Sequence, residues 1–407
     1  MNKTPGIKYG TLLSLYLAQS IPMSFFSTVM PVIMRLEAYS LTDIGLIQLI
    51  KLPWIAKFLW APVVDRTGAS IGGYKKWIIF SEIFYAIVIL SISFLSLQID
   101  FSLIVILMLI AFTASATQDI ATDAFAILIL KKDERSIGNS MQSAGSFLGT
   151  LTGSGILLII YHYWGWSYLL AALAGFVLLA LIPLMFYKGR KEIPIREAAP
   201  IITFFDIFTF FSKKGNPRRI ALLAIFYSGI IGILTMLKPW MVDMGFNVKD
   251  IGILSGIHGA AFGAAAALLA GFIVKKGGKR RSIILFASLA LMASTYFTYL
   301  TYLDKLEYYH IIIGIAMIWG AYGMSTVIIY TISMDNVRPG REGTDFTIQI
   351  VVTHLSSLII AVSSGRIADL IGYKGLFRIE FIIGIVVLAS IPYLYKEINQ
   401  SETKKAK

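Results

Sequence analysis

Long apolar stretches recur along the whole 407-residue chain, and their lengths restrict it to one class of fold. A helix needs about 20 predominantly apolar residues to cross the hydrocarbon core of a bilayer. Because 57% of the residues are hydrophobic and only 14% are charged, an ordinary soluble domain is excluded. We therefore predict an all-α integral membrane protein with 12 transmembrane helices. The predicted spans are 8–34, 43–64, 77–97, 101–130, 138–162, 166–187, 218–242, 249–275, 281–302, 308–333, 343–369 and 375–396.

Basic residues gather in the short loops that follow the even-numbered apolar stretches. Such loops stay on the cytoplasmic side of a membrane, so both termini are expected to be cytoplasmic. The loops also account for much of the formal net charge of +13. Because basic loops meet anionic lipid headgroups, the expected partner is the lipid bilayer, and nucleic acid is not expected. The residues are Arg66, Lys75, Lys76, Lys131, Lys132, Arg135, Lys275, Lys276, Lys279, Arg280, Arg281, Arg338 and Arg341.

The first apolar stretch resembles a signal peptide only in its position. It runs past 20 residues, carries Gln19 and Pro22, and lacks a small-residue cleavage pattern. We therefore expect it to be retained as the first helix. The chain has no cysteine, which excludes disulfides and thiol chemistry. The sequence predicts a multi-pass protein of the inner (cytoplasmic) membrane.

A charged interruption separates six apolar stretches from six others of nearly equal length. We predict two pseudo-symmetric six-helix bundles, at 1–187 and 218–396, a cytoplasmic linker at 188–217 and a cytoplasmic tail at 397–407. The linker contains IITFFDIFTFF at 201–211, which is too short to span and is expected to lie on the membrane surface as an amphipathic helix. Similar loops at 61–68 and 271–278 support two structural repeats.

Two carboxylates lie inside the apolar stretch 101–130. Asp119 and Asp123 are four residues apart, so they share one face of a helix, together with Ser115, Gln118 and Thr122. A carboxylate near the bilayer centre costs about 2.5–3.5 kcal/mol on insertion scales, so such residues usually line a protein-enclosed, solvated path. This polar face predicts a cavity inside a membrane carrier.

Lys57 is expected at the same depth as this acidic pair. It lies eight residues before Asp65, and Asp123 lies eight before Lys131, which places both about 12 Å inside the cytoplasmic end of their helices. Lys57 can therefore neutralise Asp119 or Asp123. Two interpretations stay open: a pair that opens when a carboxylate takes a proton, or a permanent ion bridge between helices.

Other polar side chains are spread over the apolar stretches of both halves. They could hydrogen-bond a polar, sugar-like or peptide-like solute, and Lys51 could meet a carboxylate or phosphate. For a single Gln or Tyr, a structural hydrogen bond between helices is a slightly better explanation than contact with a ligand. The candidate substrate-binding residues are Gln19, Lys51, Gln118, Gln142, Tyr322, Tyr330, Gln349 and His354.

Twelve helices in two halves, with Asp65-Arg66-Thr67-Gly68 after the second, resemble the major facilitator superfamily. Two blocks resemble its muropeptide permease and acetyl-coenzyme A transporter family: KFLWAPVVDR at 57–66, and QDIATDA at 118–124 followed by Glu134-Arg135. The resemblance implies import of anhydro-muropeptides driven by the proton motive force, or carriage of acetyl-coenzyme A. It also implies a conformational latch at Asp65, Arg66 and Arg135, in which the acid caps a helix of the opposite half. The chain departs from the superfamily pattern at Ala61 and Lys275.

Catalysis is poorly supported by the sequence. The four histidines have no metal-ligand spacing, and there is no nucleophile motif or phosphate-binding loop. We predict no enzyme activity, metal or cofactor, and a secondary active transporter that works by alternating access as a monomer. Protons are the expected coupling ion, through Asp119, Asp123 and Lys57. An anhydro-muropeptide-type small molecule is the expected substrate. The alternatives are another solute, such as an acyl-coenzyme A or a sugar conjugate, or a non-transporting membrane sensor.

Overall fold

The computed structural model describes residues 5–37, 50–187, 203–212, 215–303 and 305–395. Every regular element in this part of the chain is helical, so the predicted all-α class is confirmed. Most of the predicted linker, at 188–202 and 213–214, and the predicted tail at 397–407 lie outside the described residues. The same holds for residues 43–49 of the second apolar stretch.

The first half of the chain forms one bundle, which we call the amino-terminal bundle. Short π-helical turns extend its first and fifth crossing segments without ending them. Its elements are α1 (Pro5–Ser24), a π-helical turn (Phe25–Val29), α2 (Met30–Leu36), α4 (Leu52–Ala56), a 3-10 turn (Lys57–Leu59), α5 (Ala61–Gly68), α6 (Ile71–Ile92), α7 (Phe101–Ile129), α8 (Arg135–Leu151), a second π-helical turn (Thr152–Ile156), α9 (Leu157–Ala180) and α10 (Ile182–Phe186).

The second half forms the carboxy-terminal bundle, and one short helix lies between the two. That short helix is α11 (Phe205–Ser212). The bundle itself consists of α12 (Asn216–Ile225), α13 (Ile231–Asp243), α14 (Val248–Ile251), a π-helical segment (Gly252–His258), α15 (Gly259–Gly277), α16 (Lys279–Leu300), α17 (Tyr308–Asp335) and α18 (Glu342–Leu394).

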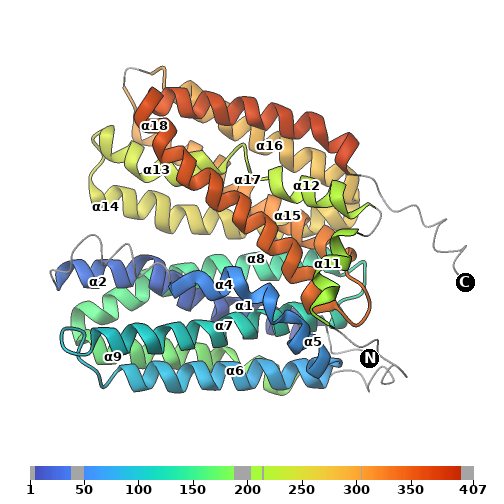
Figure 1. The fold of residues 1–407 in the computed structure, drawn as a ribbon. Coiled ribbons are helices and arrows are strands. Elements are labelled where there is room, and N and C mark those ends of the chain that lie inside the picture. Colours follow the sequence, from blue (N-terminus) through green and yellow to red (C-terminus); the bar gives the residue numbers. More distant parts are fainter. Residues whose placement is uncertain (1–4, 38–49, 188–202, 213–214, 304, 396–407) are drawn as a thin grey trace, which may run out of the picture.

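The two bundles lie one above the other, as the blue-to-green and yellow-to-red ribbons of Figure 1 show. Both described ends of the chain lie at the same end of the molecule, on the right in that view. We call this end the terminal face and the opposite end the far face. Near the terminal face a hydrophobic core crosses between the bundles, because Ile120 and Phe125 of α7 share a cluster with Met334 and Phe346.

Two glycines divide the longest helical runs. Gly165 in α9 (φ 79°, ψ −167°) and Gly372 in α18 (φ 72°, ψ 170°) take left-handed backbone conformations that disfavour other residues. Each glycine therefore ends one crossing and begins the next, at the breaks predicted after 162 and 369. Seven helical segments of the described chain are long and apolar enough to cross a membrane, and the two longest, Arg135–Phe186 and Glu342–Leu394, contain these glycines.

The predicted span 218–242 is not continuous, which corrects the sequence reading. It is split into α12 and α13 by a turn at 226–230. A Cβ atom on Gly229 would lie 2.8 Å from the Cα of Gly384, so the backbone of this turn packs directly on α18. Glu380 of α18 accepts a hydrogen bond from the backbone N–H of Gly232, which satisfies one of the free donors at the start of α13.

Two smaller differences concern helix ends. Lys75 and Lys76, predicted in a loop, lie within α6, because Ser70 caps that helix by accepting from the Gly73 N–H at 3.0 Å. Arg135 begins α8 instead of belonging to a loop. Neither difference changes the order of the crossing segments.

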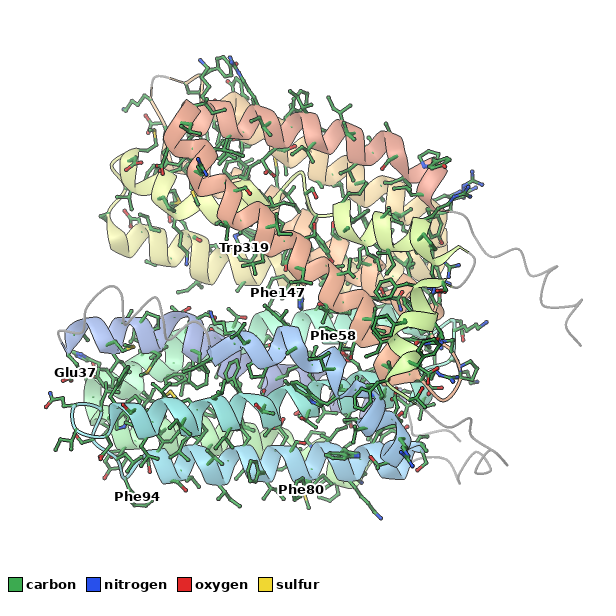
Figure 2. All side chains as sticks on the ribbon, viewed as in Figure 1. Glu37, Phe58, Phe80, Phe94, Phe147 and Trp319 are labelled. Atoms are coloured by element: carbon green, nitrogen blue, oxygen red, sulfur yellow. The ribbon has the colours of Figure 1, made fainter. Side chains whose placement is uncertain are left out.

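The outer surface of the bundles is apolar. Figure 2 shows Phe80 of α6 and Phe94, just beyond the end of that helix, projecting away from the helices, and they are 65% and 89% exposed. Phe147 and Trp319, in contrast, lie between the two bundles in the same view. Large apolar side chains pointing outward match a lipid environment, where they are not exposed to water.

The short helix α11 is amphipathic. It buries Ile207 and Phe210 in a cluster with Ile348, against which Phe58 of the amino-terminal bundle packs. Phe205 and Phe208 point outward and are 69% and 67% exposed. This helix therefore covers the junction of the two bundles at the terminal face with one side and presents phenyl rings on the other.

Candidate functional site

A cavity of about 710 Å³ lies between the two bundles. Its amino-terminal wall is rich in hydroxyl groups, and its carboxy-terminal wall is rich in aromatic rings. The amino-terminal wall consists of Thr28, Ser143, Ser146, Phe147, Thr150, Leu151, Ser154 and Gly155. The carboxy-terminal wall consists of Ile231, Leu234, Thr235, Lys238, Gly252, Ser255, Gly256, Ile257, Ala260, Trp319, Tyr322, Thr326 and Tyr330.

The hydroxyl groups of the first wall follow one face of α8 and its π-helical extension. Ser143, Ser146, Thr150 and Ser154 are separated by three or four residues, the spacing of neighbours on a helix surface. Thr150 and Ser154 each donate to the carbonyl oxygen four residues earlier, at 2.9 and 2.7 Å. Their hydroxyl oxygens keep free lone pairs, so this wall can accept hydrogen bonds from a solute.

The aromatic rings of the second wall follow one face of α17. Trp319 and Tyr322 are edge-to-face, with ring centroids 6.2 Å apart, and Phe147 approaches both from the other bundle. The indole N–H of Trp319 is buried and has no hydrogen-bond partner among the described residues. A buried donor normally has a partner. A Cβ atom on Gly259 would lie 2.7 Å from this nitrogen, so the N–H packs against α15 and only the ring of Trp319 lines the cavity.

From the cavity wall toward the terminal face, α8 and α17 are joined by successive polar contacts. Ser143 and Thr326 share a hydrogen bond of 2.9 Å, and Asn139 donates to Thr331 at 3.2 Å. Arg135, at the start of α8, is the last in this series. Its guanidinium donates to the Met334 carbonyl at 2.8 Å and forms an ion pair with Asp335 at 2.7 Å, and Asp335 also pairs with Lys279. These contacts close the cavity toward the terminal face.

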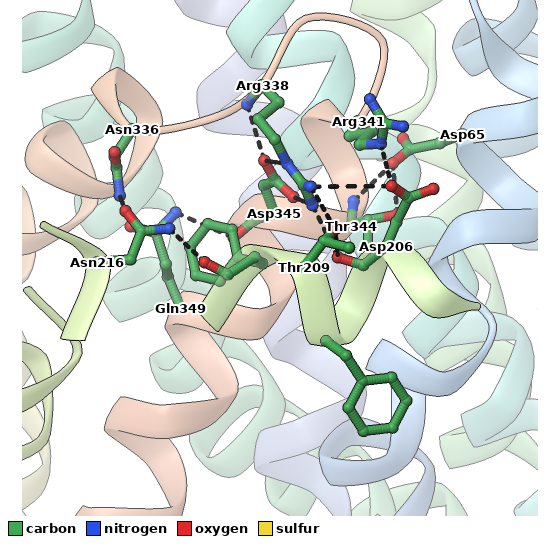
Figure 3. Close-up of polar contacts among 12 residues, drawn as sticks. Asp65, Asp206, Thr209, Asn216, Asn336, Arg338, Arg341, Thr344, Asp345 and Gln349 are labelled. Carbon is green, nitrogen blue, oxygen red and sulfur yellow. Dashed lines mark hydrogen bonds and ion pairs between the residues drawn. The ribbon is translucent and has the colours of Figure 1, made fainter. Parts of the chain in front are cut away.

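A second cross-bundle contact lies beside this series, at the start of α18. The Asp65 carboxylate accepts from the backbone N–H groups of Gly343 (2.9 Å) and Thr344 (2.7 Å) and from the Thr344 hydroxyl (2.6 Å), as Figure 3 shows in part. Tyr74 donates to the same carboxylate at 2.7 Å. A carboxylate at a helix N-terminus is favourable because the free N–H groups carry partial positive charge. Arg66, in contrast, is exposed.

The loop before α18 is held by α11. Arg338 pairs with Asp345 at 2.6 Å and donates to the Thr209 hydroxyl at 2.8 Å, and Arg341 pairs with Asp206 at 2.7 Å (Figure 3). Burial alone would raise the pKa of Asp206, but the Thr203 N–H and the Arg341 guanidinium outweigh it and hold that pKa below its usual value. Asp206 is therefore ionised at neutral pH and fastens α11 to the loop.

The predicted acidic pair is buried inside the amino-terminal bundle. Lys57 forms an ion pair with Asp119, and its ammonium lies 4.8 Å from the ring centroid of Trp54. Asp123 accepts a hydrogen bond of 2.7 Å from the Tyr16 hydroxyl. None of these side chains lines the cavity. The structure thus gives Asp119 and Asp123 different partners.

Only two of the eight candidate substrate-binding residues, Tyr322 and Tyr330, line the cavity. The amide of Gln349 donates to the carbonyl groups of Ser333 (3.1 Å) and Asp345 (2.9 Å), so it holds α17 against α18. The other five are elsewhere. Gln19, Gln118 and Gln142 are buried, Lys51 is half-buried, and His354 is exposed on α18.

Three of the four buried candidate glutamines are not fully satisfied. Gln118 has neither amide atom bonded among the described residues, and Gln19 and Gln142 each have an unbonded amide oxygen. Because α1 and α7 meet through Tyr16 and Asp123, Gln19 and Gln118 lie on helices already in contact. A polar region therefore extends from the acidic pair into the bundle.

Several residues of the site were missed by the sequence analysis. The hydroxyl groups from Ser143 to Ser154 carry a detectable signal, their helical spacing. Lys238 carries one too, because it is a cation inside an apolar stretch and the reasoning applied to Asp119 also applies to it. Asp206 and Asp335 carry no such signal, because their ion-pair partners, Arg341 and Arg135, are far away in the sequence.

Comparison with known proteins adds a family and relatives. The chain matches the family described as Major Facilitator Superfamily over residues 12–361. It is 22% identical to the anhydromuropeptide permease of Escherichia coli strain K12, over 94% of this chain and 77% of that protein. It is 21% identical to the putative transporter AmpG 4 of Rickettsia conorii, over 94% of this chain and 95% of that protein. Among solved structures, the E. coli fucose:proton symporter FucP covers 96% of this chain and 98% of its own, with a TM-score of 0.75 and 12% identity.

Proposed function

Because the chain belongs to the major facilitator superfamily, we propose that it imports an anhydro-muropeptide-type solute, coupled to protons, by alternating access. It is a multi-pass transporter of the inner membrane and not an enzyme. The observation that carries the proposal is the cavity of about 710 Å³, with hydroxyl groups on one wall and aromatic rings on the other. Rings stack on the faces of sugars and hydroxyl groups bond their polar edges. The name of the E. coli relative supports this choice of solute.

The proposed topology has twelve crossings, with both termini in the cytoplasm. The seven apolar segments supply most of them once the two longest are counted twice. The segments α4–α5, α6 and α12–α13 complete the number. The basic loops support a cytoplasmic terminal face. We propose bundle boundaries at 1–187 and 218–396, and a single chain as the functional unit, because one chain supplies both cavity walls.

With this orientation, the described conformation has its cavity closed toward the cytoplasm. The proposed latch consists of two contacts. Asp65 accepts hydrogen bonds at the start of α18, and Arg135 forms an ion pair with Asp335. Release of solute into the cytoplasm requires both contacts to break. The far ends of the bundles then approach each other, so that the solute is never open to both sides.

Proton coupling is proposed at the two buried acids. A proton on Asp119 removes the charge that holds Lys57, and a proton on Asp123 changes the carboxylate to which Tyr16 donates. Lys57 and Asp65 lie on one short segment, the 3-10 turn and α5. Movement of Lys57 is therefore transmitted directly to Asp65, which links the protonation site to the latch.

The test is uptake by purified protein in liposomes. Labelled anhydro-muropeptide uptake is measured with and without an imposed inward proton gradient, and a coenzyme A ester and a neutral glycoside are offered in parallel. We expect a gradient to accelerate muropeptide uptake in the wild type and in Asp133→Asn, a control at an exposed loop acid. Asp119→Asn and Asp123→Asn should lose that acceleration.

Two outcomes contradict the proposal separately. Acceleration that persists in both Asp119→Asn and Asp123→Asn removes these acids from the coupling mechanism. Uptake of the coenzyme A ester or the glycoside, with none of the muropeptide, replaces the proposed solute and leaves alternating access intact. A sensor would transport none of the three.

A further inference from the structure

One charged side chain lines the cavity, and we infer that it binds an anionic group of the transported solute. Lys238 of α13 is the only Lys, Arg, His, Asp or Glu among the residues that form the cavity walls in the described chain. The inference rests on the proposed function and adds the chemical class of the solute: an amphipathic saccharide that carries a carboxylate.

The charge of Lys238 is not neutralised by the protein. Lys238 is exposed, and no ion pair joins it to an acid of the described residues, whereas the buried cation Lys57 is paired with Asp119. The nearest acid along the same helix is Asp243, to which Tyr373 donates a hydrogen bond of 2.7 Å. A cation inside a membrane-spanning helix is unfavourable unless it has a partner or a function. Lys238 has no such partner among the described residues and lines the cavity, so its ammonium can meet an anion there.

The surroundings of Lys238 define the rest of the solute. Leu234 and Thr235, four and three residues earlier, lie on the same face of α13 and also line the cavity. The aromatic wall contributes the rings of Trp319 and Tyr322. A solute that satisfies this site has one apolar ring face, several hydroxyl or amide groups, and one anion. A carboxylated sugar or sugar–peptide has these three features.

Lysine suits a carboxylate or a phosphate about equally. Its ammonium is a compact point charge with three donors, so it does not require the planar, two-oxygen geometry that arginine prefers. We propose a carboxylate because the hydroxyl and aromatic walls fit a sugar–peptide. A phosphorylated sugar is the comparison ligand in the experiment.

Binding of an anion also changes the charge of the cavity. The empty cavity carries the single positive charge of Lys238, whereas the cavity with a monoanionic solute is neutral. Moving an unpaired charge through a region of low dielectric constant is unfavourable, and a close pair of opposite charges reduces this penalty. The loaded transporter can therefore change conformation more readily than the empty one.

The first experiment needs no variant. Binding of two ligands to the wild-type protein in lipid nanodiscs is measured by calorimetry: an anhydro-muropeptide with free carboxylates and its fully methyl-esterified form. We expect the acid to bind at least about tenfold more tightly than the ester, as for a charge-assisted contact. Equal affinity for acid and ester overturns the inference.

The second experiment assigns the effect to one side chain. In Lys238→Met the ratio of acid to ester affinity should fall to about one, while the ester affinity stays at the wild-type value; Lys238→Arg should keep most of the ratio. Lys276→Met, at an exposed lysine on the same bundle, is the matched control and should leave the ratio unchanged. A wild-type ratio in Lys238→Met overturns the assignment even if the acid is preferred.

The design separates this inference from the proposed function. A phosphorylated sugar and a coenzyme A ester are titrated in the same way. If one of them binds in a Lys238-dependent manner while neither muropeptide form binds, the muropeptide proposal fails and the anion site stands. If both muropeptide forms bind equally, the reverse holds.

Discussion

Asp65 of α5 accepts two hydrogen bonds from Thr344 of α18, one from the backbone N–H at 2.7 Å and one from the hydroxyl at 2.6 Å. The two residues belong to different bundles, and the Asp65 side chain is fully buried. A hydrogen bond to a charged group stabilises by about 1.5–3 kcal/mol. This pair is therefore large enough to shift the equilibrium between conformations by tenfold or more.

Asp65→Asn should weaken closure of the terminal face. The asparagine amide replaces one acceptor oxygen by an NH₂ group, which faces the N–H donors of Gly343 and Thr344. The chain has no cysteine, so Ser146→Cys places a unique thiol in the cavity. We expect a membrane-impermeant maleimide, added at the far face, to label this thiol several-fold more slowly in Asp65→Asn.

Arg66→Gln is the control for that experiment, because Arg66 is adjacent to Asp65 and exposed. Its labelling rate should equal that of the parent. Identical rates for Asp65→Asn and the parent would mean that the contact with Thr344 does not set the conformational equilibrium.

Lys57→Met and Asp119→Asn should each destabilise the protein, and the double substitution should restore much of the loss. Removing one partner of a buried ion pair leaves an uncompensated charge, which costs about 3–5 kcal/mol, whereas replacing both is close to neutral. Thermal unfolding in detergent measures the three variants. Additive losses in the double variant would show that the two side chains act independently of each other.

Asp206→Asn should loosen the attachment of α11, with an effect that does not depend on pH near neutrality. The pKa of Asp206 lies below its usual value, so its stabilising contribution is full above the unfolded pKa and is lost only as pH falls through the lower, folded value. The maleimide labelling rate of Ser146→Cys is measured in the parent and in Asp206→Asn. The ratio of these two rates should stay constant from pH 5.5 to 8. A ratio that approaches one at pH 6 would show that Asp206 takes up a proton there.

Gly145→Ala should lower stability, because this glycine lets α8 approach α1 closely. A Cβ atom there would lie 2.5 Å from the backbone oxygen of Leu13, and backbone cannot yield as a side chain can. We expect a loss of about 1–3 kcal/mol, typical of overpacking. Gly10→Ala is the matched control on α1, with no atom within 4 Å of the added methyl group. It should be neutral or stabilising by up to about 1 kcal/mol, and equal unfolding temperatures for both variants would contradict the packing argument.

The helical segments could be predicted because their signals are local. Apolar length placed α7 and α17 within a few residues of the observed bounds, and the breaks after 162 and 369 coincide with Gly165 and Gly372. The depth argument brought Lys57 to the level of the acidic pair. It could not choose between Asp119 and Asp123 as the partner of Lys57. The choice depends on Tyr16 of another helix, which donates a hydrogen bond to Asp123.

The cavity walls could not be predicted in the same way. In a membrane protein both the lipid-facing side and the packed side of a helix are apolar, so hydrophobicity does not indicate which side faces the other bundle. In the sequence, nothing distinguishes Trp319 and Ser146 from other residues of membrane helices. Only the placement of α17 opposite α8 shows that they line the cavity. The break at 226–230 was also hidden, because its residues are mostly apolar and its cause, the approach of Glu380 and Gly384, comes from α18.

That break has a consequence for how such a protein diversifies. Asn216 and Arg219 of α12 are both bonded to Asn336 at the terminal face, while Lys238 of α13 lies in the cavity. The turn at 226–230 separates the helix that makes these terminal-face contacts from the helix that lines the cavity. Substitutions in α13 that change which solute is accepted can therefore accumulate without altering the contacts of Asn216 and Arg219 with Asn336.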